Sequence, residues 1–214
     1  MRTRSSTRPR PISPRNDARQ GRPAAPRRSC RHHRLCQNHL ARSRRDASRY
    51  GLRKTRFSSP RDKFRLLYLA QDPATAIAET IVRDRFQGKA ERLILREEFD
   101  RYSIAVIRNP SPLFLLDLRY EGANLLGVST DAVRARAQTS GRRLSQEIYD
   151  RTDFDGILYM SRITNKQCVA VYDRATASIE ADGPAWDLIR LSALGPILDA
   201  LHLTVIGGGM MSNR

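Results

Sequence analysis

The chain has 214 residues, of which 40% are hydrophobic and 29% charged, and its formal net charge is +17. This length fits one domain with extensions and argues against two full enzymatic domains. The apolar content is typical of a globular protein, whereas the net charge is far above the usual range.

The positive charge is concentrated in the first quarter of the chain. Residues 1–56 contain 18 Lys and Arg against two acidic residues, while the remaining residues carry 21 basic and 20 acidic side chains. Residues 1–50 are mostly Arg, Pro, Ser and Ala, with too few apolar side chains to offset the entropy of ordering the backbone. We therefore expect disorder over residues 1–50. Two origins remain open: a natural basic tail, or a start site too far upstream or in the wrong frame.

The sequence carries no targeting or membrane signal. No run of 18 apolar residues is present, and the N-terminus lacks the apolar stretch of a secretory signal. Three cysteines predict no disulfide framework and agree with a reducing compartment. We expect a cytoplasmic protein without membrane contact.

One cluster of potential metal ligands occurs in the basic segment, formed by Cys30, His32, His33, Cys36 and His39. Structural zinc sites usually combine two such pairs separated by a dozen or more residues, and the second pair is missing here. The spacing therefore predicts no metal site.

After Gly51 the apolar pattern becomes regular. Residues 64–70 form a short apolar run that predicts a buried strand. Asp72 and Pro73 then provide an N-cap and a first helical residue, and apolar side chains recur at helical spacing until about Gly88. The sequence thus predicts a strand followed directly by a helix.

The rest of the chain mixes short strands and helices. Strands are predicted over residues 92–96, 102–108, 113–118, 157–159 and 167–172, the last two joined by a loop over 161–166 and preceded by a turn at Asp155-Gly156. Helices are predicted from Ser129 or Thr130 past Gly141, and over residues 185–200 with a break at Pro196. Without a regular βαβ order, this pattern favours an α+β domain over residues 51–206, with a mixed twisted sheet and flanking helices. We expect residues 207–214 to be a flexible tail.

Sequence motifs of the common nucleotide-binding and hydrolytic folds are missing. There is no phosphate loop, His-Glu-x-x-His or Gly-x-Ser-x-Gly sequence. Residues 205–209, Val-Ile-Gly-Gly-Gly, imitate the start of a dinucleotide fingerprint, but only five residues follow them. Since a helix cannot form there, we interpret this sequence as part of a flexible end.

Glu79 lies on the predicted helix, at the edge of its apolar face. At about 100° per residue it stands roughly 60° beyond Val82, so its side chain can border the core without entering it. One interpretation is a solvated pair with Arg83 at i,i+4, worth roughly 0.3–0.5 kcal/mol. The other is a functional carboxylate.

Four short sequences favour the second interpretation. They are Thr-Arg-Phe at 55–57, Leu-Tyr-Leu-Ala at 67–70, Ala-Ile-Ala-Glu-Thr at 76–80 and Asp-Gly-Ile-Leu-Tyr-Met-Ser-Arg at 155–162. In this order and spacing, from about residue 51 to 175, the chain resembles the RES-domain family, named for its Arg, Glu and Ser. The resemblance implies an ADP-ribosyltransferase-like fold. It also implies a toxin of a type II toxin–antitoxin pair that depletes NAD.

The resemblance further implies cleavage of the nicotinamide–ribose bond, with water or phosphate as acceptor and NAD as a consumed substrate rather than a cofactor. Glu79 would bind the ribose hydroxyls and face the developing cation, and Arg56 would hold the pyrophosphate. Tyr68 and Ser161 would approach the nicotinamide ribose, and Arg162 the phosphates. Glu79, Arg56 and Ser161 are thus the expected catalytic residues. The expected partner is an antitoxin with a DNA-binding half.

Other interpretations stay open for single residues and for the whole chain. Tyr68 could be a core residue, Arg53 could replace Arg56, and Ser161 could only form a loop. Family members also carry an Arg on an earlier strand, and the sequence before Gly51 offers no apolar strand to hold one. If that part of the site is missing, the chain is an inactive truncated homologue. The chain could instead bind nucleic acid nonspecifically through residues 1–50, which a deletion of that segment would test.

Overall fold

A computed structural model of the chain describes residues 27–30, 35–37, 55–125 and 138–207. These residues contain a nine-stranded sheet in which the strands follow the order β1-β6-β7-β8-β3-β2-β5-β10, with β9 paired to β5. The strands are β1 (Arg27–Cys30), β2 (Leu35–Gln37), β3 (Leu66–Ala70), β5 (Ser103–Arg108), β6 (Leu113–Asp117), β7 (Gly156–Met160), β8 (Gln167–Tyr172), β9 (Glu180–Ala181) and β10 (Trp186–Asp187). A separate parallel pair joins β4 (Leu93–Leu95) and β11 (Thr204–Ile206).

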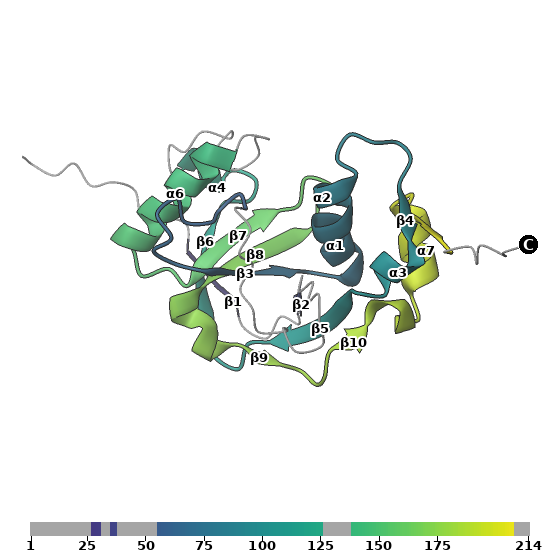
Figure 1. Cartoon of the computed structure of the whole chain (residues 1–214). Coiled ribbons are helices and arrows are strands. Elements are labelled where there is room, and N and C mark those ends of the chain that lie inside the picture. The colour runs from purple at the N-terminus through teal and green to yellow at the C-terminus, as the bar shows by residue number, and fades with distance from the viewer. Residues whose placement is uncertain (1–26, 31–34, 38–54, 126–137, 208–214) are drawn as a thin grey trace, which may run out of the picture.

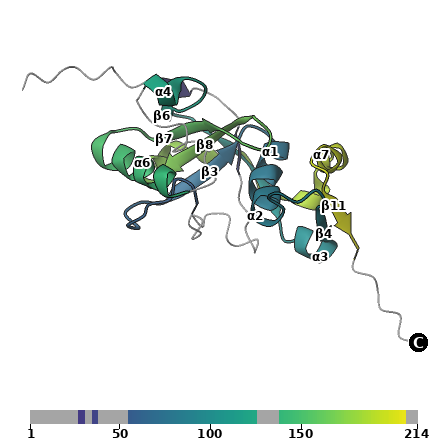
Figure 2. The same ribbon diagram turned by 90° about the horizontal axis from the view of Figure 1, so that it is seen from above.

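Helices pack around this sheet, as Figure 1 shows. They are α1 (Pro73–Ile77), the π-helix η1 (Ala78–Val82), α2 (Arg83–Arg85), α3 (Arg96–Phe99), α4 (Gly122–Leu125), α6 (Gln138–Arg151), the 3-10 helices η2 (Asp173–Ser178) and η3 (Leu188–Arg190), and α7 (Leu194–Ala200). Both views place α6 at one end of the sheet and the α1–η1–α2 helix between the central strands and the unit of β4 and α7 (Figures 1 and 2). None of the helices in the described part of the chain has the length and apolar character needed to cross a membrane.

The sheet is mixed, as the sequence predicts. The β6–β7 pair is parallel, and the other pairs in the described sheet are antiparallel. The predicted strands over residues 64–70, 92–96, 102–108, 113–118, 157–159 and 167–172 all occur, and their ends agree with the prediction or differ from it by one or two residues. The α+β prediction is therefore confirmed.

Two strands lie inside the segment for which the composition predicts disorder. β1 pairs with β6, and β2 lies between β3 and β5 in the sheet. In these seven residues, sheet partners supply hydrogen bonds that the local composition does not reveal, whereas disorder over residues 1–50 as a whole stays a prediction. The prediction that no early strand precedes residue 51 is wrong because of these sheet partners. The rest of residues 1–50 lies outside the described part of the chain.

The helix after β3 begins as predicted. The Asp72 side chain accepts a 2.8 Å hydrogen bond from the Thr75 amide, and Pro73 occupies the first turn. The helix then continues through a π-helical turn over residues 78–82 and ends at Arg85. Gly88 follows shortly after it, and its φ of 80° is the left-handed conformation common after helices. Wider π-helical turns are rare and often occur at functional sites, and this one contains Glu79.

Gly156 is the first residue of β7 rather than part of a turn. A Cβ placed there would lie 2.4 Å from the carbonyl oxygen of Ala170, so β8 can approach β7 closely only if residue 156 is glycine. Asp155 before it accepts a 2.8 Å hydrogen bond from the Phe114 amide. The predicted turn at Asp155-Gly156 is therefore wrong: Gly156 allows β7 and β8 to pack closely, and Asp155 binds the backbone of β6.

The C-terminal part differs most from the prediction. Residues 185–200 contain β10, η3 and α7 instead of one broken helix, and Pro196 lies in the first turn of α7, where proline is tolerated. Val205 and Ile206, interpreted as part of a flexible end, belong to β11. They pair with β4, which the local sequence cannot predict because the partner lies about 110 residues earlier. Residues 208–214, and the part of the predicted second helix before residue 138, lie outside the described residues.

Two apolar clusters meet at the α1–η1–α2 helix. One packs the sheet against α6 and includes Phe57, Phe64, Tyr159 and Tyr172. The other packs the opposite side of the helix, through Ile77 and Ile81, against Phe99 and the C-terminal unit. The helix is held on both sides, so a side chain on its remaining face has a fixed position relative to the ends of β3 and β7.

Candidate active site

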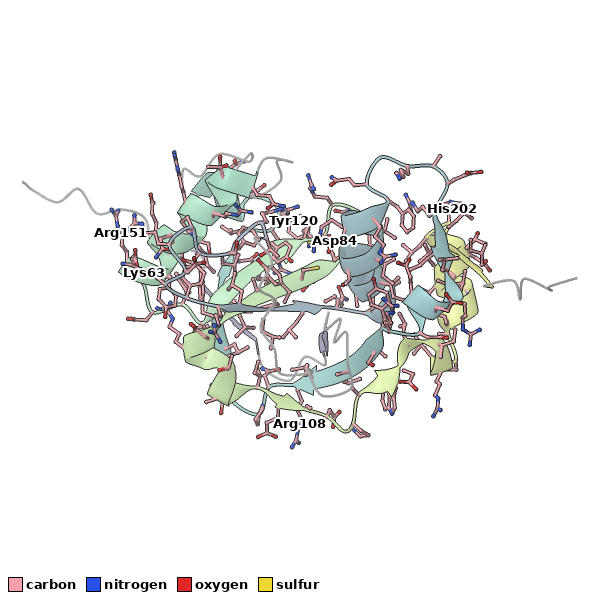
Figure 3. The ribbon with its side chains drawn as sticks, in the orientation of Figure 1. Lys63, Asp84, Arg108, Tyr120, Arg151 and His202 are labelled. Atoms are coloured by element: carbon pink, nitrogen blue, oxygen red, sulfur yellow. The ribbon has the colours of Figure 1, made fainter. Side chains whose placement is uncertain are left out.

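A cleft opens where this helix faces the ends of β3 and β7. Its larger part has a volume of about 400 Å³ and is lined by Thr55, Arg56, Tyr68, Glu79, Arg83, Asp84, Gln87, Gln138, Tyr159 and Arg162. An adjoining part of about 250 Å³ shares Arg56, Glu79, Arg83, Gln87 and Arg162 and adds Val82, Phe86, Gly88, Arg92 and Ile163. Figure 3 labels Asp84 at the edge of the helix. The two parts form one cleft with Glu79 at their junction.

Glu79 is almost completely buried in this cleft, with 4% of its surface exposed. Its Oε1 accepts a 2.7 Å hydrogen bond from the Ser161 hydroxyl, and its Oε2 lies 3.2 Å from Nη1 of Arg83. The expected position at the border of the core is therefore corrected to a buried one. The expected pair with Arg83 exists, but it lies in the wall of the cleft and not on an open surface. A carboxylate is stable in such a place because both of its oxygens are hydrogen-bonded.

Ser161 fixes this carboxylate from the end of β7. Its hydroxyl, which is 2% exposed, also accepts hydrogen bonds of 3.1 and 3.2 Å from the amides of Ile163 and Thr164. Ser161 thus forms its loop, as the alternative interpretation expects, and at the same time holds Glu79. Thr164 reaches back to Thr75 of α1 through a 2.9 Å hydrogen bond, which ties the loop to the helix.

Tyr68 holds the segment that carries Arg56. Its hydroxyl lies 2.6 Å from the hydroxyl of Thr55 and accepts a 3.3 Å hydrogen bond from the Phe57 amide. On the outer side, Nε of Arg142 donates to the Thr55 carbonyl at 2.9 Å. Arg56 therefore projects from a loop anchored both to β3 and to α6. Burial raises the pKa of Tyr68, so its hydroxyl is neutral at physiological pH.

The aromatic side chains of Tyr68 and Tyr159 line the larger part of the cleft. Tyr159 on β7 is 4% exposed, and its ring meets that of Phe57 edge-on at 5.1 Å. Burial, together with the charge of Glu79, raises the pKa of Tyr159 well above its usual value. Burial also raises the pKa of Cys168, its partner on β8. Both groups are therefore neutral at physiological pH.

Arginines line the rim. Arg56 is half-buried, with its guanidinium carbon 6.0 Å from the Phe57 ring centre, and Arg162 is exposed. Arg83 is partly exposed; burial opposes its charged form, but the carboxylates of Asp84 and Glu79 raise its pKa overall. A buried carboxylate under a positively charged rim suits an anionic ligand with a developing positive charge at one atom.

All five residues expected from the sequence lie at this place. Arg56, Tyr68, Glu79 and Arg162 line the cleft, and Ser161 stands behind Glu79. Sequence reasoning did not name Tyr159 as a site residue, and it considered Arg83 only as the partner of Glu79 in a solvated pair. One spacing could have indicated Tyr159: it precedes Ser161 by two residues, so in an extended chain the two side chains lie on the same face.

The described residues contain no group of three or more His, Cys, Asp and Glu side chains placed to hold a metal ion. The cluster from Cys30 to His39 falls on residues whose side chains lie outside the described part of the chain.

The comparisons with known proteins agree with one another. The family model of the RES domain matches residues 26–190. A "Probable toxin y4kH" from Sinorhizobium fredii is 30% identical over 112 residues, which cover 51% of this chain and 87% of that protein. A chain of the solved M. tuberculosis MbcT-MbcA toxin-antitoxin complex has a similar fold, with a TM-score of 0.54 and 15% identity over 82% of this chain and 93% of that one. Because the family model spans most of the sequence and includes the whole cleft, the chain belongs to the RES-domain family.

Proposed function

We propose that this protein is the toxin of a toxin–antitoxin pair and that it degrades NAD by cleaving the bond between nicotinamide and ribose. The observation that carries this proposal is the buried Glu79 carboxylate, held by Ser161 beneath a rim of arginines. The toxin role draws on the similarity to the probable toxin y4kH.

The chemistry needs few groups. The C–N bond breaks with its electron pair leaving on nicotinamide, and the ribose carbon gains oxocarbenium character before water or phosphate adds and a proton is lost. A carboxylate that is held in place and faces this carbon stabilises the cation, as Glu79 would do without moving. Its oxygens can also accept hydrogen bonds from the ribose hydroxyls.

The rest of the cleft matches the other parts of NAD. In the larger part, the rings of Tyr68 and Tyr159 offer apolar faces to nicotinamide and ribose. Arg56 and Arg162, which line both parts, offer guanidinium groups to the pyrophosphate. In this arrangement Ser161 acts through Glu79, because its hydroxyl is already occupied by the carboxylate and two amides.

The test is incubation of the purified protein with NAD, with and without phosphate, followed by chromatography. We expect nicotinamide to be released, with ADP-ribose as the second product in water and a phosphorylated ADP-ribose when phosphate is the acceptor. A Glu79→Ala variant serves as the control. Release no greater than in this variant, under both conditions, would contradict the proposal and favour an inactive homologue.

The proposed partner is an antitoxin with a DNA-binding half that covers the cleft. The similarity in fold to a chain of a toxin–antitoxin complex supports a partner of this kind. Expression without a partner should then stop growth and lower cellular NAD, whereas the Glu79→Gln variant should be harmless. Normal growth with intact NAD, despite expression of folded protein, would count against the proposal.

Nonspecific binding of nucleic acid is the second candidate, favoured by the charge of residues 1–56. Deletion of residues 1–50 would not test it cleanly, because that change also removes β2 from the interior of the sheet. Deletion of residues 1–25 leaves both early strands in place. Nucleic-acid binding should weaken in this variant, while release of nicotinamide should continue.

A further inference from the structure

Arg83 connects the two carboxylates of the helix that faces the cleft. Its Nη1 lies 3.2 Å from Oε2 of Glu79, one turn earlier, and its Nε donates to Oδ1 of Asp84 at 2.9 Å. The side chain is 28% exposed and lines both parts of the cleft. Arg83 therefore covers the outer oxygen of Glu79 while it remains in contact with the space where a ligand would lie.

The two hydrogen bonds of Glu79 differ in strength. The bond from Ser161 measures 2.7 Å and is buried, with Ser161 fixed by its own loop. The bond from Arg83 is longer than the 2.7–2.9 Å that is usual for a charged pair. Because Arg83 is also the more exposed partner, it is the one that can leave without disturbing the fold.

The pair with Arg83 is unfavourable for the proposed reaction. A guanidinium bound to Glu79 offsets the negative charge that would stabilise an oxocarbenium-like transition state. The charge of Glu79 becomes fully effective only when Arg83 has another anion to bind. A dinucleotide brings such an anion, since its pyrophosphate carries two negative charges and suits the planar fork of donors of an arginine.

We propose that Arg83 covers Glu79 in the free protein and transfers to the pyrophosphate of NAD when the dinucleotide enters the cleft. This proposal rests on the proposed function. Under this proposal Arg83 is a substrate-binding residue. Asp84 competes with the pyrophosphate for Arg83, because its carboxylate also binds the Arg83 guanidinium and lines the larger part of the cleft.

The proposal is tested with three variants at these two positions. Arg83→Gln removes the cation, so KM for NAD should rise about tenfold or more, as expected for the loss of a charged hydrogen bond, while kcat should not fall. Arg83→Lys keeps the charge but loses the fork, so KM should be intermediate. Asp84→Asn releases Arg83 and removes a negative charge near the phosphates, so KM should fall about two- to threefold.

The matched control is Arg85→Gln, on the same helix. Arg85 pairs with Glu98, is similarly exposed and does not line the cleft, so both kinetic constants should stay at the wild-type values. Calorimetric titration with ADP-ribose, which has the pyrophosphate but no nicotinamide, should show the same order of affinities as the KM values. This second measurement separates binding from chemistry.

Each outcome decides one point. A lower kcat with unchanged KM in Arg83→Gln would mean that Arg83 only positions Glu79, and would overturn the transfer. Unchanged constants in that variant, or a higher KM in Asp84→Asn, would overturn it as well. In all of these cases the wild type still releases nicotinamide. If the wild type releases none, the proposed function fails, and this inference fails with it.

Discussion

The two walls of the cleft differ in how firmly their side chains are held. The sheet wall consists of Tyr68 and Tyr159, which line the cleft, together with Ser161 behind Glu79, and it is mostly buried and hydrogen-bonded within the protein. The arginine wall, formed by Arg56, Arg83 and Arg162, is partly or fully exposed. A buried wall fixes geometry, whereas an exposed charged wall can adapt to a ligand. We therefore expect changes in the sheet wall to lower kcat and changes in the arginine wall to raise KM.

The largest effect is expected at Glu79, where the two walls meet. Glu79→Gln keeps the size and hydrogen-bonding capacity of the side chain but removes its charge, so kcat should fall by roughly 10² to 10³. The dissociation constant for NAD should change much less, because the charge acts chiefly in the transition state. Glu98→Gln, which alters an exposed carboxylate of another ion pair, is the control. A small change in melting temperature with unchanged kcat would assign Glu79 a purely structural role.

The next effect is expected for Ser161→Ala in the sheet wall. The variant leaves Glu79 without its 2.7 Å hydrogen bond and two loop amides without an acceptor, so kcat should fall about tenfold and the free energy of unfolding by about 1–3 kcal/mol. Ser145→Ala separates these two effects, since Ser145 is equally buried but bonds Tyr172 under α6. Its stability should drop while kcat stays constant. Equal kcat losses in both variants would contradict a specific role for Ser161.

A smaller effect is expected for Arg162→Gln in the arginine wall. Because this side chain is exposed, its interaction with a phosphate is weakened by solvent, and KM should rise only about threefold with kcat unchanged. Arg108→Gln provides a control outside the cleft, at the end of β5, where Arg108 pairs with Glu180. If Arg162→Gln lowered kcat instead of raising KM, the division of roles between the two walls would be wrong.

The smallest effect concerns stability at high pH. Burial raises the pKa of Tyr68 and Tyr159 in the folded protein, whereas in the unfolded chain both titrate near the usual value of about 10. The folded state then keeps protons that the unfolded state loses, so this contribution to stability is complete below about pH 10 and declines as the pH rises above it. Melting temperatures between pH 8 and 11 should fall more steeply in the wild type than in Tyr159→Phe. An equally steep fall of the melting temperature in both proteins would contradict the raised pKa of Tyr159.

The sequence alone determined the main elements around the cleft, and its resemblance to a known family indicated four of the residues that line it, Arg56, Tyr68, Glu79 and Arg162. Asp72 and Pro73 specify the start of a helix through local contacts, and the apolar spacing after them places Glu79 on that helix, so no distant partner is needed. The strand containing Tyr68 and the strand that ends before Ser161 follow from similarly local patterns.

The tertiary structure decided what depends on distant partners. Ser161 meets Glu79 across 82 residues of sequence, and only this contact together with the pair to Arg83 explains why a charged side chain is buried there. β2 is a strand because β3 and β5 lie on either side of it, although its own sequence favours disorder. Helical caps and periodicity involve neighbours within about four residues, whereas desolvation and sheet pairing depend on which segments the whole fold brings together.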